Sequence, residues 1–175
     1  TDRSYACSPQ FPGSGTYKRH TAFPAFLINS FICCSFLVCM DYRQLPKIEL
    51  HLHLDCSLSY KVVQQIDPAV SYEDYYHSFV APPRCTDLVD YLKRAVKGFE
   101  LMQTKEQLRL VTLDLFEQLK ADHVIYAEIR FAPLLHLAKG LTPVEVVEIV
   151  NEAFSEGKAM TGMEGGLILC TLRHY

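Results

Sequence analysis

A strict alternation of polar and apolar side chains runs through residues 47–54, KIELHLHL. Successive side chains of a β-strand point to opposite faces of the sheet, so a period of two residues is typical of a strand. The apolar face would carry Ile48, Leu50, Leu52 and Leu54, and the polar face would carry Lys47, Glu49, His51 and His53. We therefore predict a strand over residues 47–54 with two histidines on its polar face.

Helical patterns separate this strand from two further strands. Apolar residues at helical spacing predict a helix over residues 86–102, in which Gly98 is a weak point. A capping box begins a second helix at Thr104, and Thr142 followed by Pro143 is a strong start for a third. Shorter helical turns are expected over residues 60–66 and 72–79. Two further strands are expected over residues 123–131 and 167–174, and Gly165 and Gly166 are expected to break the chain before the second of them. This order predicts βαβ units and a parallel sheet.

Composition and charge exclude several classes of protein. The chain has 175 residues and a formal net charge of −3, so it carries no basic excess that would favour nucleic acid or an anionic membrane. This length suits one domain. After residue 39 the only cysteines are Cys56, Cys85 and Cys170, which form no C-x-x-C pair and no disulfide framework. We expect reduced thiols and a cytoplasmic location.

Residues 1–39 differ from the rest of the chain. Residues 22–40 are mostly apolar and follow the basic pair Lys18 and Arg19, as in a signal peptide or a membrane anchor. The run contains polar residues and lacks a cleavage site, which favours a third interpretation, upstream sequence translated in frame with Met40 as the start. We therefore expect residues 1–39 to be a leader outside the fold, residues 40–175 to form the domain, and no membrane association.

The polar face of the first strand has the spacing of a metal site. Side chains at positions i and i+2 of a strand point the same way, roughly 6.5–7 Å apart, so His51 and His53 present two imidazoles toward one point, and Asp55 continues this face. Such a pair is also common on a solvated strand. A parallel sheet is covered on both faces, however, and a polar face there needs a partner such as a metal or a polar substrate. Glu128 and Arg130 share a face of the second strand, where they either pair between strands or support the metal site.

Four blocks of this sequence resemble the adenosine deaminase family, which are zinc-dependent aminohydrolases with a TIM-barrel fold. The blocks are residues 45–58 (LPKIELHLHLDCSL), 125–133 (IYAEIRFAP), 141–143 (LTP) and 168–174 (ILCTLRH). The resemblance begins near residue 40 and implies an α/β fold, namely the N-terminal part of a TIM (β/α)₈ barrel with about three βα units, incomplete at the C-terminus.

The resemblance also implies roles for individual residues. His51 and His53 would be the first two zinc ligands, with His53 also close to the substrate. Asp55 would hydrogen-bond the ribose, and because relatives that act on free adenine tend to have Glu there, Asp55 favours a nucleoside. Tyr91 and Leu92 would belong to a helix that gates the purine pocket.

One residue departs from the family pattern, because Cys56 stands where the family usually has Gly. If that Gly serves a turn with positive φ, a cysteine there would be strained. A ligand role for its thiolate is an alternative to a purely structural thiol.

The remaining groups of the family's site have no counterpart before Tyr175. These are the third zinc-binding His, an H-A-G-E motif with the catalytic Glu, a further His and the last zinc-ligating Asp. The chain is therefore expected to be a fragment of an enzyme that converts adenosine and deoxyadenosine to inosine and ammonia. Two imidazoles leave a zinc site incomplete, so we expect the chain alone neither to turn over adenosine nor to bind zinc tightly.

Two alternatives remain at this point. The substrate could instead be adenine, AMP or another amino-purine, or the chain could be a non-catalytic binding protein derived from such a barrel. Nothing in the sequence indicates an oligomeric state.

Overall fold

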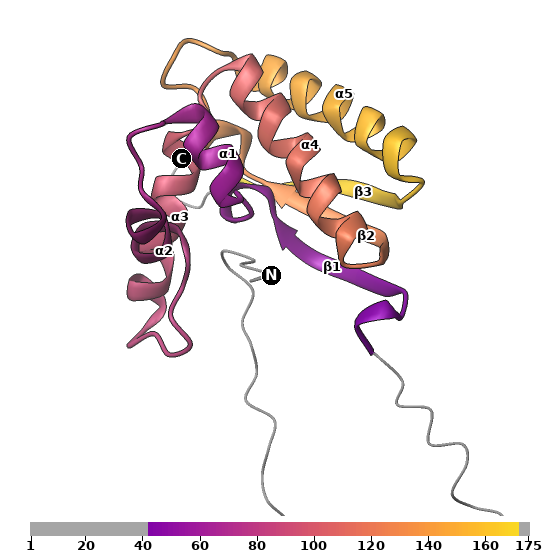
Figure 1. Ribbon diagram of the computed structural model, residues 1–175. Helices are drawn as coiled ribbons and strands as arrows, with labels where there is room; N and C mark the ends of the chain where they lie inside the picture. Colours follow the sequence, from indigo (N-terminus) through magenta and orange to yellow (C-terminus); the bar gives the residue numbers. More distant parts are fainter. Residues whose placement is uncertain (1–41, 172–175) are drawn as a thin grey trace, which may run out of the picture.

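The computed structural model describes residues 42–171 (Figure 1). The expected leader, residues 1–39, and the last residues of the expected third strand, residues 172–174, lie outside this range. Within residues 42–171 no helix is both long enough and apolar enough to cross a membrane.

Among the described residues, three parallel strands form one sheet: β1 (Lys47–His53), β2 (Val124–Phe131) and β3 (Glu164–Leu169), in the order β1-β2-β3. Their carboxyl ends therefore lie at one edge of the sheet. The βαβ order and the parallel pairing expected from the sequence are confirmed.

In the part of the chain that the structure describes, five helices and three 3₁₀ turns connect or precede the strands. The helices are α1 (Tyr60–Ile66), α2 (Tyr72–Phe79), α3 (Leu88–Glu100), α4 (Lys105–Ala121) and α5 (Pro143–Thr161), and the turns are η1 (Tyr42–Gln44), η2 (Leu54–Cys56) and η3 (Pro133–Leu135). Thr104 and Thr142 are the N-caps of α4 and α5, each in a complete capping box with the residue three positions later. The predicted starts of both helices are thus confirmed.

The core lies between the sheet and one layer of helices. Figure 1 shows α4 and α5 side by side over one face of the sheet, with α1, α2 and α3 grouped beyond the end of β1. In β2, Ala127, Ile129 and Phe131 are buried, whereas Glu128 and Arg130 between them are only partly buried. The buried face of β2 belongs to the same apolar cluster as Leu115 of α4 and Val150 of α5.

The strict alternation predicted for residues 47–54 is wrong in its first half. A register shift between Glu49 and Leu52 places one more residue in β1 than in the facing part of β2, which is a β-bulge. Ile48 and Leu50 are each 59% exposed, whereas Leu52 and Leu54 are buried. The predicted apolar face therefore belongs to the core only at its carboxyl end.

Strand boundaries also differ from the prediction, and β1 and β3 end earlier than expected, at His53 and Leu169. β2 begins one residue later, because His123 adopts a φ of +60°. β3 begins at Glu164, so Gly165 and Gly166 lie within the strand and do not break it. The reason at Gly165 is space, since a Cβ there would lie 2.1 Å from the carbonyl oxygen of Ala127 in the neighbouring strand.

Candidate metal and substrate site

A cavity of about 560 Å³ opens at the carboxyl edge of the sheet. Its polar lining comes from residues at or just after the strand ends, including His53, Asp55, Arg130 and Cys170, and its apolar lining comes largely from α3. This volume lies within the roughly 300–1,000 Å³ typical of small-molecule sites, and the carboxyl ends of parallel strands are where α/β proteins place such sites.

The two histidines of β1 lie close together at this edge. The ring centroids of His51 and His53 are 5.3 Å apart and the rings are tilted by 45°. The Nε2 atom of His51 lies 2.7 Å from Nη1 of Arg130. A guanidinium only donates hydrogen bonds, so this nitrogen of His51 accepts one, and its lone pair is engaged by Arg130.

Arg130 joins the ends of β1 and β3. Its Nε and Nη2 atoms donate to the Sγ atom of Cys170 at 3.2 and 3.0 Å, while its third nitrogen contacts His51. Glu128 instead accepts a hydrogen bond of 3.3 Å from the hydroxyl of Tyr126, and the nearby carboxylate raises the pKa of that phenol. Arg130 thus joins neighbouring strands and at the same time contacts a candidate metal ligand, His51.

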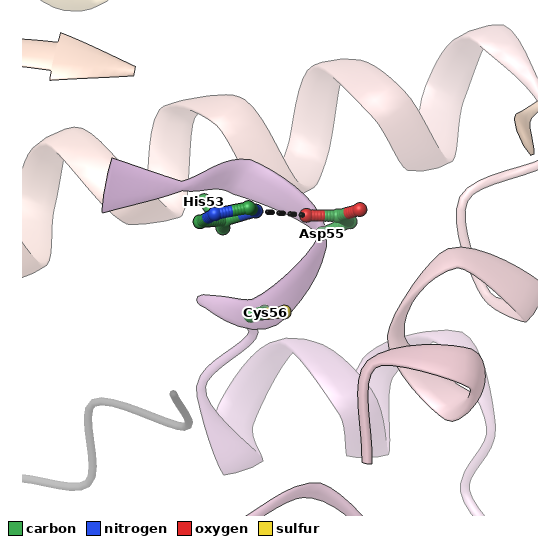
Figure 2. A group of neighbouring side chains, drawn as sticks. All are labelled: His53, Asp55 and Cys56. Carbon is green, nitrogen blue, oxygen red and sulfur yellow. Dashed lines mark ion pairs between the residues drawn. The ribbon is translucent and has the colours of Figure 1, made fainter. Parts of the chain in front are cut away.

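Asp55 lies on η2 and faces His53 (Figure 2). Its Oδ1 atom is 3.6 Å from Nδ1 of His53, and the two side chains are 10% and 43% exposed. This distance is too long for a hydrogen bond, and Oδ1 is buried without any hydrogen-bond partner. Burying a carboxylate oxygen without a hydrogen-bond donor costs free energy, so this oxygen of Asp55 is available to bind a cation or to accept a hydrogen bond from a bound molecule.

Cys56 is the third donor of this turn. Cys56 lines the cavity, and the donor atoms of His53, Asp55 and Cys56 all lie within 4.8 Å of one another. The expected backbone strain at Cys56 is wrong, because His123 is the only non-glycine residue with a positive φ in residues 42–171, and η2 is a 3₁₀ turn that a cysteine adopts readily.

Helix α3 forms the apolar wall of the cavity. Tyr91 and Leu92, the residues expected to gate a purine pocket, both line it. Gly98 of the same helix lies against the backbone of η2, where a Cβ would be 1.9 Å from the carbonyl oxygen of Asp55. The glycine interpreted as a weak point of this helix is therefore what allows the helix to approach the site.

His136 is a buried residue near the site that the sequence did not single out. Its Nδ1 atom is 3.0 Å from the carbonyl oxygen of Met102, and its Nε2 atom is buried without a hydrogen-bond partner. Burial lowers the pKa of His136, against the opposing effects of the Asp55 charge and the Met102 carbonyl. Only its position after β2 could have indicated it, since a single histidine in a loop is not a specific signal.

The donors at this edge fit a zinc ion. Imidazole nitrogen, carboxylate oxygen and thiolate sulfur are the three protein ligand types of Zn²⁺. His53, Asp55 and Cys56 supply all three at the end of β1, and the unpartnered oxygen of Asp55 is the structural sign that something else pairs with this group.

Sequence comparison relates this chain to named proteins. A family model described as adenosine deaminase matches residues 46–175. Adenosine deaminase of Clostridium perfringens is 38% identical over 143 residues, which are 78% of this chain and 43% of that protein. Adenosine deaminase of Clostridium acetobutylicum is 39% identical over 137 residues, 74% of this chain and 41% of that protein. The chain thus spans less than half the length of these curated relatives.

Solved structures share the fold. A zinc-bound amidohydrolase from Burkholderia ambifaria has a TM-score of 0.59 at 16% identity, over 73% of this chain and 36% of that one. Adenine deaminase from Arthrobacter aurescens has a TM-score of 0.55 at 22% identity, over 71% and 39%. N6-methyl-AMP deaminase from Arabidopsis thaliana has a TM-score of 0.53 at 21% identity, over 73% and 40%. The prediction of an α/β fold that corresponds to part of a TIM barrel is confirmed.

Proposed function

The chain belongs to the adenosine deaminase family, and from that premise we propose that it supplies the opening strands of a zinc-dependent aminohydrolase that converts adenosine and deoxyadenosine to inosine or deoxyinosine and ammonia. The observation that carries this proposal is the gathering of His51, His53 and Asp55 at the carboxyl end of β1, beside a cavity with an apolar wall. Domain boundaries of 40–175, with residues 1–39 outside the fold, belong to the same proposal.

The choice of a nucleoside rests on Asp55. Its carboxylate is one-tenth exposed at the cavity and has an oxygen without a hydrogen-bond partner, so it can accept a hydrogen bond from a ribose hydroxyl. The structural neighbours named for adenine and for N6-methyl-AMP are the reason to keep adenine and AMP as competing substrates.

In the proposed reaction the residues of this chain bind zinc and orient the purine substrate. His51 and His53 hold zinc from the end of β1, which requires Arg130 to release Nε2 of His51. Zinc, when bound, supplies a nucleophile at neutral pH because it lowers the pKa of water to about 7. Tyr91 and Leu92 cover the purine ring from α3 and exclude solvent.

The proton donor for the purine ring is expected beyond Tyr175, so we propose that the chain alone is inactive. The cytoplasm is the proposed location, supported by Cys56, Cys85 and Cys170, none of which is in a disulfide.

A chimeric barrel tests the proposal. The chain is joined to the part of the Clostridium perfringens adenosine deaminase that lies beyond the matched region, and ammonia release is measured with adenosine, deoxyadenosine, adenine and AMP. We expect the chimera to act fastest on the two nucleosides and the chain alone to release no ammonia. The matched control is the chimera with His53→Ala, which should fold and lose activity.

Each other outcome has a separate meaning. A chimera that prefers adenine or AMP would overturn the assignment of Asp55 but keep the class of reaction. A folded, zinc-loaded chimera that acts on none of the four substrates would contradict the proposed activity and favour a binding protein. Deamination by the unjoined chain would contradict the placement of the proton donor beyond Tyr175.

A further inference from the structure

The end of β1 and the turn that follows it carry three different metal donors within four residues. Imidazole, carboxylate and thiol come from His53, Asp55 and Cys56, and their donor atoms lie within 4.8 Å of one another. Figure 2 shows the three side chains on one bend of the backbone, with the imidazole of His53 directed at the carboxylate of Asp55.

The spacing suits donors that share one tetrahedral ion. Donors about 2.0–2.3 Å from a tetrahedral zinc ion lie roughly 3.3–3.8 Å from one another. Nδ1 of His53 and Oδ1 of Asp55 are 3.6 Å apart, which falls within that interval. The full set lies within 4.8 Å, so the three donors must draw together by up to about 1 Å to share one ion.

One observation indicates that this group can take a cation, and a second indicates which residues would hold it. Oδ1 of Asp55 is buried and accepts no hydrogen bond, although the side chain faces the cavity. His51, the other candidate imidazole, has its Nε2 lone pair directed at Arg130. The neighbouring carboxylate and thiol are thus better placed than His51 to join His53 around an ion.

We propose that this chain holds a zinc-class divalent cation through His53, Asp55 and Cys56, a ligand set that needs no residue beyond Tyr175. Three protein ligands leave one position for water or another ligand, as in zinc sites that are not purely structural. Binding releases the thiol proton of Cys56 to the solvent, since the thiolate is the form that coordinates.

This site alters one expectation from the sequence. Two imidazoles alone predict weak zinc binding, whereas a carboxylate and a thiolate bring the ligand number to three without His51. The proposed deaminase activity uses His51 with His53 for zinc in a completed barrel and leaves Asp55 for the ribose. The present inference concerns the chain on its own, does not rest on that activity, and fails in a different experiment.

Cobalt absorption of the full chain tests the proposal, because cobalt(II) takes the place of zinc and shows a thiolate charge-transfer band. The starting protein carries serine in place of the other thiols of the N-terminal region, namely Cys7, Cys33, Cys34 and Cys39. We expect one equivalent of cobalt to give a thiolate band and a tetrahedral visible spectrum, both of which zinc abolishes by displacement.

Variants assign the ligands. Cys56→Ser should remove the thiolate band and weaken cobalt binding more than about 100-fold, since even residues that only orient a ligand typically contribute 10–100-fold. Asp55→Asn should keep the band and weaken binding. Cys85→Ser is the matched control, because Cys85 does not line the cavity, and it should change neither quantity.

The His51→Ala variant separates the two ligand sets. Binding and spectrum that survive His51→Ala but not His53→Ala support the proposed set. A cobalt spectrum without a thiolate band, or one lost equally in His51→Ala, would overturn it and return the site to the two histidines. Circular dichroism of each variant before cobalt is added confirms that a loss of binding is not a loss of fold.

Discussion

Gly98→Ala should destabilise the protein although alanine is the better helix former. The new Cβ would lie 1.9 Å from the carbonyl oxygen of Asp55, whereas ordinary contact begins at 3.4 Å, so α3 and η2 would have to separate by about 1.5 Å. Both partners are backbone, so no side chain can rotate away to relieve the contact.

The magnitude follows from two opposing terms. Overpacking costs about 1–3 kcal/mol, and a contact between two backbones belongs at or above the upper end of that range. Replacing a helical glycine by alanine returns about 1 kcal/mol through the lower entropy of the unfolded chain. We therefore expect a net loss of about 2 kcal/mol in the free energy of unfolding.

Urea unfolding followed by circular dichroism measures this loss. With a slope of about 2 kcal/mol per molar urea, the midpoint should fall by about 1 M. Gly166→Ala is the control, because a Cβ there has no atom within 4 Å, and its midpoint should stay close to that of the wild type. A midpoint for Gly98→Ala at or above the wild-type value would refute the close contact between α3 and the turn that carries Asp55.

Three further predictions follow from caps, core and charge. In the unfolded chain His136 takes up a proton near pH 6.5, whereas burial lowers its pKa in the folded protein, so stability should fall as the pH drops below about 6.5. Thermal melts over a pH series measure this fall. The His136→Asn variant should show a weaker dependence of its melting temperature on pH. Thr104→Ala removes the acceptor of the 3.3 Å bond from the Gln107 amide and should cost about 1 kcal/mol in urea unfolding; an unchanged midpoint would argue against the cap. Leu115→Ala, at a fully buried position of α4, should cost about 2–5 kcal/mol, and a loss below 1 kcal/mol would place this helix face outside the core.

Local signals explain why the helices were predictable from the sequence. Thr104 with Gln107 and Thr142 with Glu145 form capping boxes in the structure, and each is a bond between residues three positions apart. Such signals need no knowledge of the rest of the fold. β2 was predictable for a similar reason, since from Ala127 to Phe131 its apolar residues are buried and the polar residues between them are only partly buried.

The bulge in β1 was not predictable, because it is a property of the pairing with β2. Neither glycine nor proline marks it within residues 47–53, and its effect appears only when the register is followed from Glu49 to Leu52. Bulges bend a strand and redirect its side chains, often next to active sites. The alternation predicted the candidate residues His51 and His53, but the exposure of Ile48 and Leu50 depends on the register shift.

Two glycines that the sequence predicted to weaken their elements are required by the packing of those elements in the structure. By local propensity Gly98 weakens a helix and Gly165 interrupts a strand, yet each lies in the element where a Cβ would collide with a backbone carbonyl of another segment, that of Asp55 or of Ala127. Both contacts join residues about 40 positions apart, so no local rule detects them. One of the two sets the distance between α3 and the turn of Asp55, and that distance determines the width of the cavity between the apolar wall and the polar donors. A larger residue at position 98 should therefore change ligand binding as well as stability, even though Gly98 itself touches no ligand.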